Sequence, residues 1–449
     1  MKVAAYAIRK TLQHYANSGY LLIATALLAF VAANTAFSEA YFSLWEKNIY
    51  FRIGDFDILT HHGVPMTVMQ FINDALMAVF FFAVGLEIKR EVLVGELSSF
   101  KKAALPVIGA LGGVIIPITV YSLIAEGAEQ MQGAAIPMAT DIAFSLGILS
   151  LFGRRVPIGL KIFLATLAVA DDLIGITVIA VFYTDSLYPE YLVYAAVLFA
   201  VMIAGMRFRV SSKMFYIIMG TGVWFLFLNS GIHPTIAGVL TAFCVPARPQ
   251  MKTSRFINEI KEVLAEFPAS DGHRKGKNRI LSPEQMNMLK NVESASDKVI
   301  SPLQDLEDSL HPLVNYLIIP LFAFANAGVS LDGITLQNLA TGVTPAVAAG
   351  LFVGKFAGIL SFSAIAIRMK ISEMPQGVTW RSLAGVSALG GIGFTVSFFI
   401  SSLAFGEEHA RLLSDAKLGI IAGSLLSGLA GWIILKKTLP EIAGEDTPE

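Results

Sequence analysis

The stretch LATLAVADDLIGITVI, residues 164–179, is an apolar run with two adjacent aspartates, Asp171 and Asp172, at its centre. One carboxylate at the centre of a bilayer helix costs about 3 kcal/mol on insertion scales. Neighbouring carboxylates also repel each other, so the two cannot both ionise freely where the dielectric constant is low. A pair that must share protons or bind a cation is a candidate functional site.

The composition of the whole chain indicates a membrane protein. Of its 449 residues, 55% are hydrophobic and 15% are charged, and the mean hydropathy is +0.65. A soluble protein would carry about 25% charged residues. Together with repeated apolar segments, this predicts an all-α polytopic membrane protein. The lone Cys244 excludes an intrachain disulfide, and the apolar run 20–36 is expected to be an uncleaved first helix.

Apolar segments recur along the chain and predict about twelve transmembrane helices. We expect them at about 17–37, 66–88, 103–124, 134–152, 156–183, 190–207, 213–229, 233–247, 312–329, 343–367, 379–404 and 412–435. Lys and Arg gather in alternate connections, so both termini are expected in the cytoplasm. The predicted parts are a cytoplasmic segment 1–16, helices 1–8 in 17–247, a long cytoplasmic loop 248–301, helices 9–12 in 302–437 and a cytoplasmic tail 438–449.

Two connections are more than simple turns. Aromatic and polar residues alternate at about 41–58, which predicts an outer hairpin, with an irregular loop on the lipid headgroups as the alternative. In the long loop, residues 253–267 place apolar side chains on one helical face. Ser282 and Ser301 begin capping patterns, so this loop is predicted to be partly helical. Its basic cluster at 274–279 is either a solvated patch or a contact with lipid or protein.

Unusual residues of four predicted spans lie at one depth. These residues are Asp141, Asp171, Lys355 and Thr395. Each of them is 13–16 positions along the chain from a basic residue of a predicted cytoplasmic turn. At 1.5 Å per residue, these separations are roughly 20–24 Å. All four therefore lie near the middle of a hydrocarbon core of about 30 Å.

Two of these spans carry helix-breaking residues at that depth, Pro137 before Thr140 and Asp141 in one and the glycine-rich stretch 390–393 in the other. The surrounding triplets of spans, 103–183 and 343–435, are weakly similar and opposite in predicted topology. This predicts two inverted repeats, each with a discontinuous helix, crossing at mid-membrane. Asp141 would neutralise helix N-termini, and Lys355 helix C-termini or an aspartate. Charge balance alone is the alternative role for both.

A charged cluster at the predicted cytoplasmic end combines one span with a later one. It consists of Glu87, Lys89, Arg90 and Glu91, with Glu307, Asp308 and His311. Such residues are either helix-end anchors or a funnel that collects cations and senses pH, because histidine changes charge near neutrality.

Five motifs closely resemble the NhaA family of sodium/proton antiporters. They are VGLEIKRE at 84–91, ATDIAFS at 139–145, AVADDL at 168–173, FAFANAGV at 322–329 and GGIGFT at 390–395. The family is one in which inverted repeats are known. The resemblance covers nearly every predicted span.

The resemblance implies a transporter, not an enzyme, that exchanges cytoplasmic Na⁺ or Li⁺ for external protons in a bacterial inner membrane. It assigns ion and proton binding, including Na⁺, to Asp171 and Asp172, with Asp172 the direct ligand. Thr140 and Asp141 correspond to the broken fourth span and Lys355 to the tenth. The set Glu87, Glu307 and His311 matches a pH-responsive region, and the outer hairpin matches a dimer contact. No cofactor, nucleic acid or organic substrate is implied.

Two departures from the family pattern leave points open. Residues 304, 305 and 308 are polar or acidic where better-known members have basic residues or histidine, and the loop 248–301 is longer. The mechanism expected is competition of Na⁺ and protons for the same carboxylates, electrogenic if two protons exchange for one Na⁺. A sodium-coupled symporter is the main alternative. An intramembrane aspartyl protease is remote, because the glycine-rich stretch lacks an acid.

Overall fold

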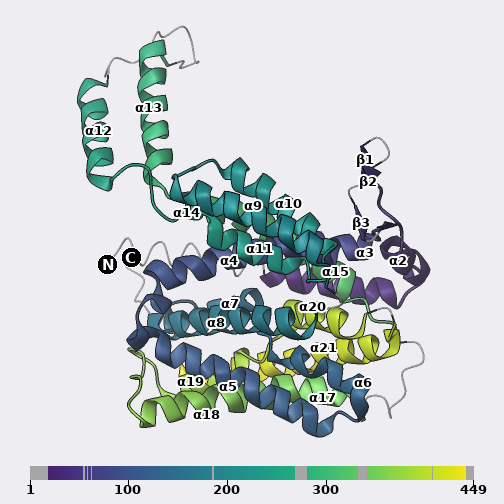
Figure 1. Cartoon of the computed structure of the whole chain (residues 1–449). Coiled ribbons are helices and arrows are strands. Elements are labelled where there is room, and N and C mark those ends of the chain that lie inside the picture. The colour runs from purple at the N-terminus through teal and green to yellow at the C-terminus, as the bar shows by residue number, and fades with distance from the viewer. Residues whose placement is uncertain are drawn as a thin grey trace, which may run out of the picture.

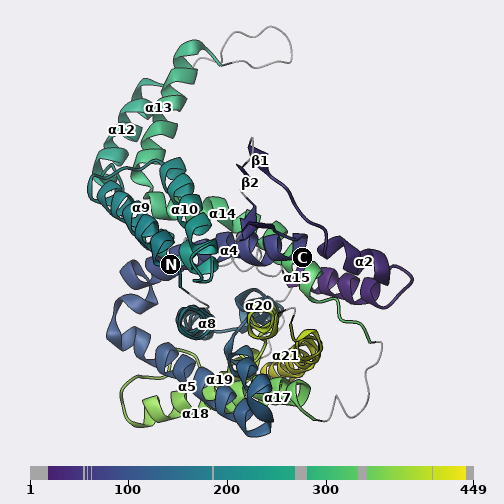
Figure 2. The same cartoon turned by 45° about the vertical axis from the view of Figure 1, so that its right-hand side comes forward.

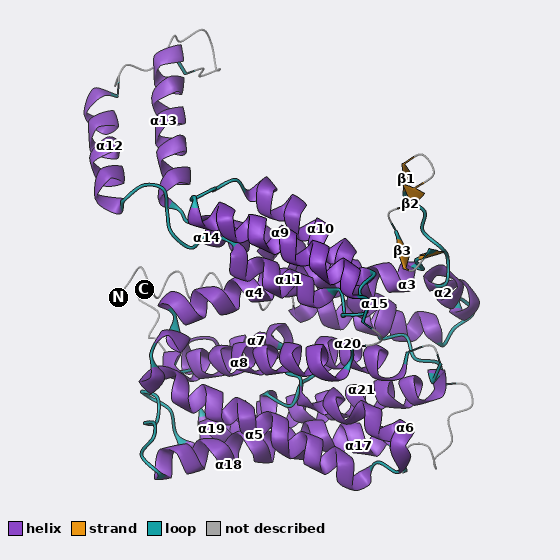
Figure 3. Ribbon diagram, in the orientation of Figure 1, coloured by secondary structure: helices purple, strands orange, loops and turns teal. Residues whose placement is uncertain are grey.

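The computed structural model describes residues 19–440 except 54–55, 58, 62, 185–186, 268–280, 332–340 and 407. The predicted N-terminal segment 1–16, most of the tail 438–449 and the basic cluster 274–279 lie outside the described residues. The described chain is helical apart from four two-residue strands (Figure 3). Its helices form two layers that run side by side (Figures 1 and 2).

The first layer, at the top of Figure 1, is built around the span Val68–Val94 and the helices that pack on it. Its elements are α3 (Val68–Gln70), the π-helical turn η1 (Phe71–Leu76), α4 (Met77–Val94), α9 (Pro189–Arg207), α10 (Lys213–Leu228), α11 (Thr235–Cys244), α14 (Pro302–Leu313), the π-helical turn η5 (Val314–Ile318) and α15 (Ile319–Asn326).

The second layer is built around two helix pairs, α5 with α18 and α19 with α21. Its elements are η2 (Glu96–Ser98), α5 (Phe100–Ile124), α6 (Gly127–Met131), η3 (Gln132–Met138), α7 (Ile142–Ser150), η4 (Gly153–Arg155), α8 (Ile158–Phe182), α17 (Val343–Ala349), the π-helical turn η6 (Gly350–Gly354), α18 (Lys355–Arg368), α19 (Trp380–Leu389), α20 (Phe394–Phe405) and α21 (Ala410–Thr438). Helices α4 and α8 touch across the two layers.

Each of the predicted apolar segments contains helix in the structure. Among the described residues, seven helices are long and apolar enough to cross a membrane, or up to ten if each bent pair is one span. Two shorter apolar helices, α10 and α11, add to these. The chain is thus an all-α protein with the composition and helix lengths of a polytopic membrane protein.

Two spans are broken where helix-breaking residues were noted. The pair Gly127–Met138 and Ile142–Ser150 bends by 42°, and the pair Trp380–Leu389 and Phe394–Phe405 bends by 44°. A third bend, of 113°, joins the helix Gly19–Ala33 to α2 (Ser38–Trp45) and was not predicted.

The region of the predicted outer hairpin is part helix and part strand. Residues from Tyr41 to Trp45 belong to α2. The rings of Tyr41 and Trp45 lie one helical turn apart, and both pack edge-on against Phe324, with centroids 5.5 and 5.7 Å away. The strands follow later as two antiparallel pairs. These are β1 (Arg52–Ile53) with β2 (Phe56–Asp57) and β3 (Thr60–His61) with β4 (Val64–Pro65).

The segment 248–301 contains two helices, α12 (Thr253–Glu266) and α13 (Pro283–Val299), which pack on each other and stand away from both layers (Figure 1). The helix caps predicted at Ser282 and Ser301 are present, since each side chain accepts a hydrogen bond from the glutamine amide three residues later.

Candidate functional site

The two helix breaks contact each other in the second layer. The Asp141 amide donates to the Ile392 carbonyl at 2.6 Å, and the Thr140 hydroxyl donates to the Gly390 carbonyl at 2.8 Å. One turn further, the Ser145 hydroxyl donates to the Leu389 carbonyl at 2.9 Å. Backbone and side-chain groups of one broken helix therefore donate to carbonyls of the other around the place where its hydrogen-bond ladder stops.

Asp141 lies between the N-termini of α7 and α20. One carboxylate oxygen accepts from the Phe144 amide at 2.9 Å. The other accepts from the Thr395 amide at 3.1 Å and from its hydroxyl at 2.7 Å. A carboxylate in this position caps both half-helices and neutralises the positive ends of their dipoles. The structure brings Asp141 to the helix ends that the sequence pattern indicated.

Lys355 joins the broken helices to α8. Its ammonium group donates to a carboxylate oxygen of Asp171 and, at 2.9 Å, to the hydroxyl oxygen of Thr140. Lys355 is 0% exposed and Asp171 is 3% exposed. Charges this deeply buried need partners of opposite sign and further hydrogen bonds. The lysine, the threonine and the open carbonyl of Gly390 thus form one continuous chain of hydrogen bonds with Asp171.

Asp172 has a different environment from its neighbour. Consecutive residues point about 100° apart on a helix, and the Asp172 side chain lines a cavity of about 730 Å³ instead of contacting Lys355. Thr140, Asp141 and Thr395 line the same cavity. Carboxylate and hydroxyl oxygens therefore meet at this end, where a small cation or protons can bind.

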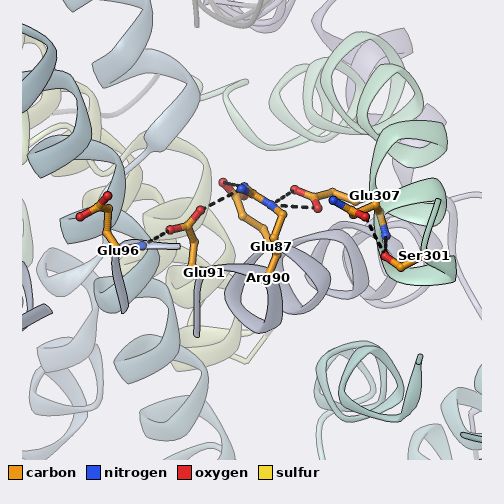
Figure 4. Close-up of polar contacts among 7 residues, drawn as sticks. Glu87, Arg90, Glu91, Glu96, Ser301 and Glu307 are labelled. Atoms are coloured by element: carbon orange, nitrogen blue, oxygen red, sulfur yellow. Dashed lines mark hydrogen bonds and ion pairs between the residues drawn. The ribbon is translucent and has the colours of Figure 1, made fainter. Parts of the chain in front are cut away.

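The other end of the cavity is lined by the predicted charged cluster. Glu87, Arg90, Glu307, Asp308 and His311 all contribute to its wall. The Arg90 guanidinium donates to both carboxylate oxygens of Glu307, at 2.9 and 3.0 Å (Figure 4). It also lies 2.9 Å from Glu91 and 4.0 Å from Glu87. This network connects α4 to α14 beside the cavity.

Lys89 is the member of the cluster that the structure places elsewhere. Its ammonium group donates to the carbonyls of Phe243 and Val245, at 2.7 and 2.5 Å, and is not part of the cavity wall. A lysine at this position satisfies the carbonyls that end α11. Glu91 is also outside the wall, and it contributes through Arg90.

Three polar residues of the cavity wall were not predicted as site residues from the sequence: Gln304, Asn315 and Tyr316. Asn315 lies one turn beyond His311, and its amide nitrogen is 2.7 Å from His311 Nδ1. A polar residue within the apolar run 312–329 was the available signal. Among the described residues, no group of three or more His, Cys, Asp or Glu side chains is placed to hold a metal ion.

Comparison with known proteins agrees with the resemblance noted from the motifs. Residues 9–435 match the family described as Na⁺/H⁺ antiporter 1. A protein of Phocaeicola vulgatus named Na⁺/H⁺ antiporter NhaA is 51% identical over 437 residues, which is 97% of each chain. One of the same name from Bacteroides fragilis is 50% identical over 426 residues, 95% of this chain and 96% of its own. The chain therefore belongs to the Na⁺/H⁺ antiporter family.

Proposed function

We propose that the protein exchanges cytoplasmic Na⁺, or Li⁺, for external protons at Asp171 and Asp172. As a member of an antiporter family it is a transporter and not an enzyme. The observation that carries the site assignment is the division of the aspartate pair. One carboxylate is bound to a buried lysine, and the other lines a cavity to which charged residues contribute.

The mechanism proposed is competition for the same oxygens. Na⁺ binds Asp172 from the cavity with help from Thr140 and Asp141, and protons displace it when the site is exposed to the other side. The two carboxylates and Lys355 titrate as one coupled group. If two protons exchange for one Na⁺, each cycle moves one net charge, so membrane potential drives transport with about 2.3 kcal/mol per 100 mV.

The charged cluster is proposed to be the cytoplasmic entrance. Negative side chains in a narrow, low-dielectric cavity raise the local concentration of cations. Glu87, Glu307 and His311 then respond to cytoplasmic pH through the ion pair with Arg90. Lys89 is left out of this proposal, because it binds the end of α11.

The distribution of basic residues supports the orientation, with both termini and the segment 248–301 in the cytoplasm of a bacterium. The proposed topology has about twelve spans, with repeats at 103–183 and 343–435 of inverted topology. A homodimer formed through the region of the predicted outer hairpin, about 41–58, and the absence of any cofactor complete the proposal. A symporter is the weaker candidate, because the matched family is described by exchange.

Everted membrane vesicles with a preformed proton gradient test the exchange. Na⁺ should collapse the gradient with the unaltered protein, and Asp172→Asn should abolish the response because an amide cannot carry the charge that Na⁺ and protons compete for. A pH-sensitive dye reports the gradient. Glu129→Gln is the matched control, since Glu129 is exposed on α6, and it should exchange normally.

Unchanged exchange by Asp172→Asn would overturn the site assignment. Loss of the response in both variants would indicate a general defect in folding or insertion, which expression level and size-exclusion behaviour would reveal. No response to Na⁺ or Li⁺ by the unaltered protein would overturn the function itself.

A further inference from the structure

Helices α12 and α13 form an antiparallel hairpin whose root is fixed to the first layer. The Met251 amide, just before α12, donates to the Lys298 carbonyl near the end of α13 at 2.9 Å. The Leu303 amide of α14 donates to the Pro246 carbonyl, just after α11, at 3.2 Å. These backbone hydrogen bonds join the chain that enters the hairpin to the chain that leaves it. The hairpin is therefore a defined projection of the fold.

Each helix of the hairpin uses one face to pack on the other. On α12 this contact face carries Phe256, Ile260 and Val263, which are partly buried. On α13 it carries Gln285, which is 5% exposed, and Val292, which is partly buried. Spacings of three, four and seven keep such residues on one side of a helix.

A second apolar face of the hairpin remains uncovered in the described part of the chain. It carries Ile257 and Leu264 of α12, which are 46% and 70% exposed, and Met286 and Leu289 of α13, which are both 43% exposed. Each of the four follows a buried or partly buried residue by one position, or about 100° around its helix. Because the two helices run in opposite directions, the same rotation brings all four side chains to one side of the hairpin.

The opposite side of the hairpin is polar. Its residues precede the contact face by one position, and they are Arg255, Glu262, Glu284 and Asn291, all exposed. The hairpin thus separates charged side chains from apolar ones on its two free sides. Exposed apolar side chains gathered on one side of a water-facing element mark a surface that another molecule covers.

The apolar pairs of the two helices lie at the same height along the hairpin. The midpoint of the α12 pair is nine to ten residues from Met251, and that of the α13 pair is ten to eleven residues from Lys298, to which Met251 is bonded. At 1.5 Å per residue, both midpoints lie roughly 14–16 Å from the root. A single two-fold axis at that height would bring each pair against its own copy, so the face is complementary to itself.

The hairpin also projects in the direction expected of a dimer contact. It rises from the first layer on the same side as the strand region does at the other end of the spans (Figures 1 and 2). The strand region belongs to the part of the chain at which the homodimer is proposed. Two copies in one membrane have the same orientation, so a two-fold axis that relates them runs along the membrane normal. One such axis can meet both projections.

We propose that the α12–α13 hairpins of two copies pack through this apolar face into a four-helix bundle, a second contact of the homodimer at the cytoplasmic end. The inference rests on the homodimer and the orientation proposed above and goes beyond the exchange reaction. Four side chains per copy bury less than the roughly 1,200 Å² of a stable interface, so the bundle strengthens a dimer formed mainly elsewhere. Because α13 leads through Ser301 into α14, the contact also holds the helix that carries Glu307 and His311.

Disulfide crosslinking in membranes tests the bundle. With Cys244→Ser as background, Ile257→Cys combined with Leu264→Cys should give a dimer that a reducing agent separates, because position 257 of one copy lies opposite position 264 of the other. The two positions cannot be joined within one chain, since seven helical residues separate them by about 10 Å. Arg255→Cys combined with Glu262→Cys, at the same spacing on the polar side, is the matched control and should stay monomeric on a denaturing gel.

Absence of the crosslink on the apolar side, or equal crosslinking on both sides, would overturn the bundle. Na⁺-dependent proton movement in vesicles that carry the unaltered protein reports the proposed function separately. Exchange without the crosslink would overturn the bundle alone, and a crosslink without exchange would overturn the function alone.

A charge placed on the apolar face tests the contact in a second way. Leu264→Glu should raise the dissociation constant of the dimer in detergent by about tenfold, or about 1.4 kcal/mol, because two like charges would meet in the bundle. Light scattering over a dilution series gives the constant. Glu262→Gln, on the polar side, is the control and should leave it unchanged. An unchanged constant for Leu264→Glu would overturn the bundle, and a monomer at every concentration of the unaltered protein would overturn the homodimer itself.

Discussion

At the scale of single residues, two neighbouring aspartates have different environments because one lysine can reach only one of them. Lys355 approaches α8 from α18 and pairs with Asp171, whereas Asp172 points about a quarter turn away into the cavity. The Asp171 oxygen Oδ1 has no hydrogen-bond partner among the described residues and is buried. The stability of this carboxylate therefore depends on Lys355.

Replacing Lys355 by methionine should destabilise the protein by about 3–5 kcal/mol, the cost of leaving a buried charge without its partner. The midpoint of thermal unfolding in detergent measures the loss. The double variant Lys355→Met with Asp171→Asn should recover much of it, because the charge that needed a partner is gone. A double variant as unstable as the single one would show that Lys355 stabilises the fold by packing instead.

At the scale of elements, the position of Lys355 depends on how closely α5 and α18 approach. Gly112 lies against the backbone of Gly358, and a methyl group at either position would overlap a carbonyl oxygen of the other. A Cβ at Gly113 would lie 3.5 Å from Cδ of Lys355. These glycines let the two backbones meet, and the lysine lies one turn from the contact.

Gly112→Ala should therefore push α18 away from α5 and cost about 1–3 kcal/mol by overpacking. Because the shift moves Lys355, the rate of exchange should also fall. Thermal unfolding and vesicle exchange measure the two effects. Gly175→Ala on α8 is the control, since the nearest atom to its new Cβ would be Cε of Met138 at 3.7 Å. Equal effects of both substitutions would contradict this account of the packing.

Helix geometry also explains why Lys89 lies apart from the cavity wall. Adjacent positions in sequence look like one cluster, but residues two apart point to nearly opposite sides of a helix. Glu87 and Arg90 share the face towards α14, and Lys89 points towards the end of α11. The sequence alone could not show which helix each of these faces would pack against.

At the scale of the whole molecule, the cavity lies where the first layer meets the second. Its wall combines α4, α14 and η5 of one layer with α7, α8 and α20 of the other. The strand region projects from the first layer at the end opposite α12 and α13 (Figure 1).

Removal of that region should turn the proposed dimer into a monomer. Residues 50–65 can be replaced by a short Gly-Ser link, because the Ile49 amide donates to the Met66 carbonyl at 2.8 Å and keeps the cut ends together. Size-exclusion chromatography with light scattering, in dilute detergent solution, gives the mass. Exchange activity should persist, since no residue of this region lines the cavity. A mass equal to that of the unaltered protein would place any dimer contact elsewhere.

The sequence by itself determined the membrane-protein class, the helical segments and the two helix breaks. It also predicted Thr140, Asp141, Asp171, Asp172 and Lys355 as site residues, which the structure brings close together. Hydropathy, helix-breaking residues and buried charges are local signals, and their costs apply wherever the segments finally pack. The tertiary structure decided which aspartate pairs with the lysine, that Lys89 caps α11 and that α2 replaces part of the hairpin. These depend on contacts between segments far apart in the chain, for which no single stretch carries the information.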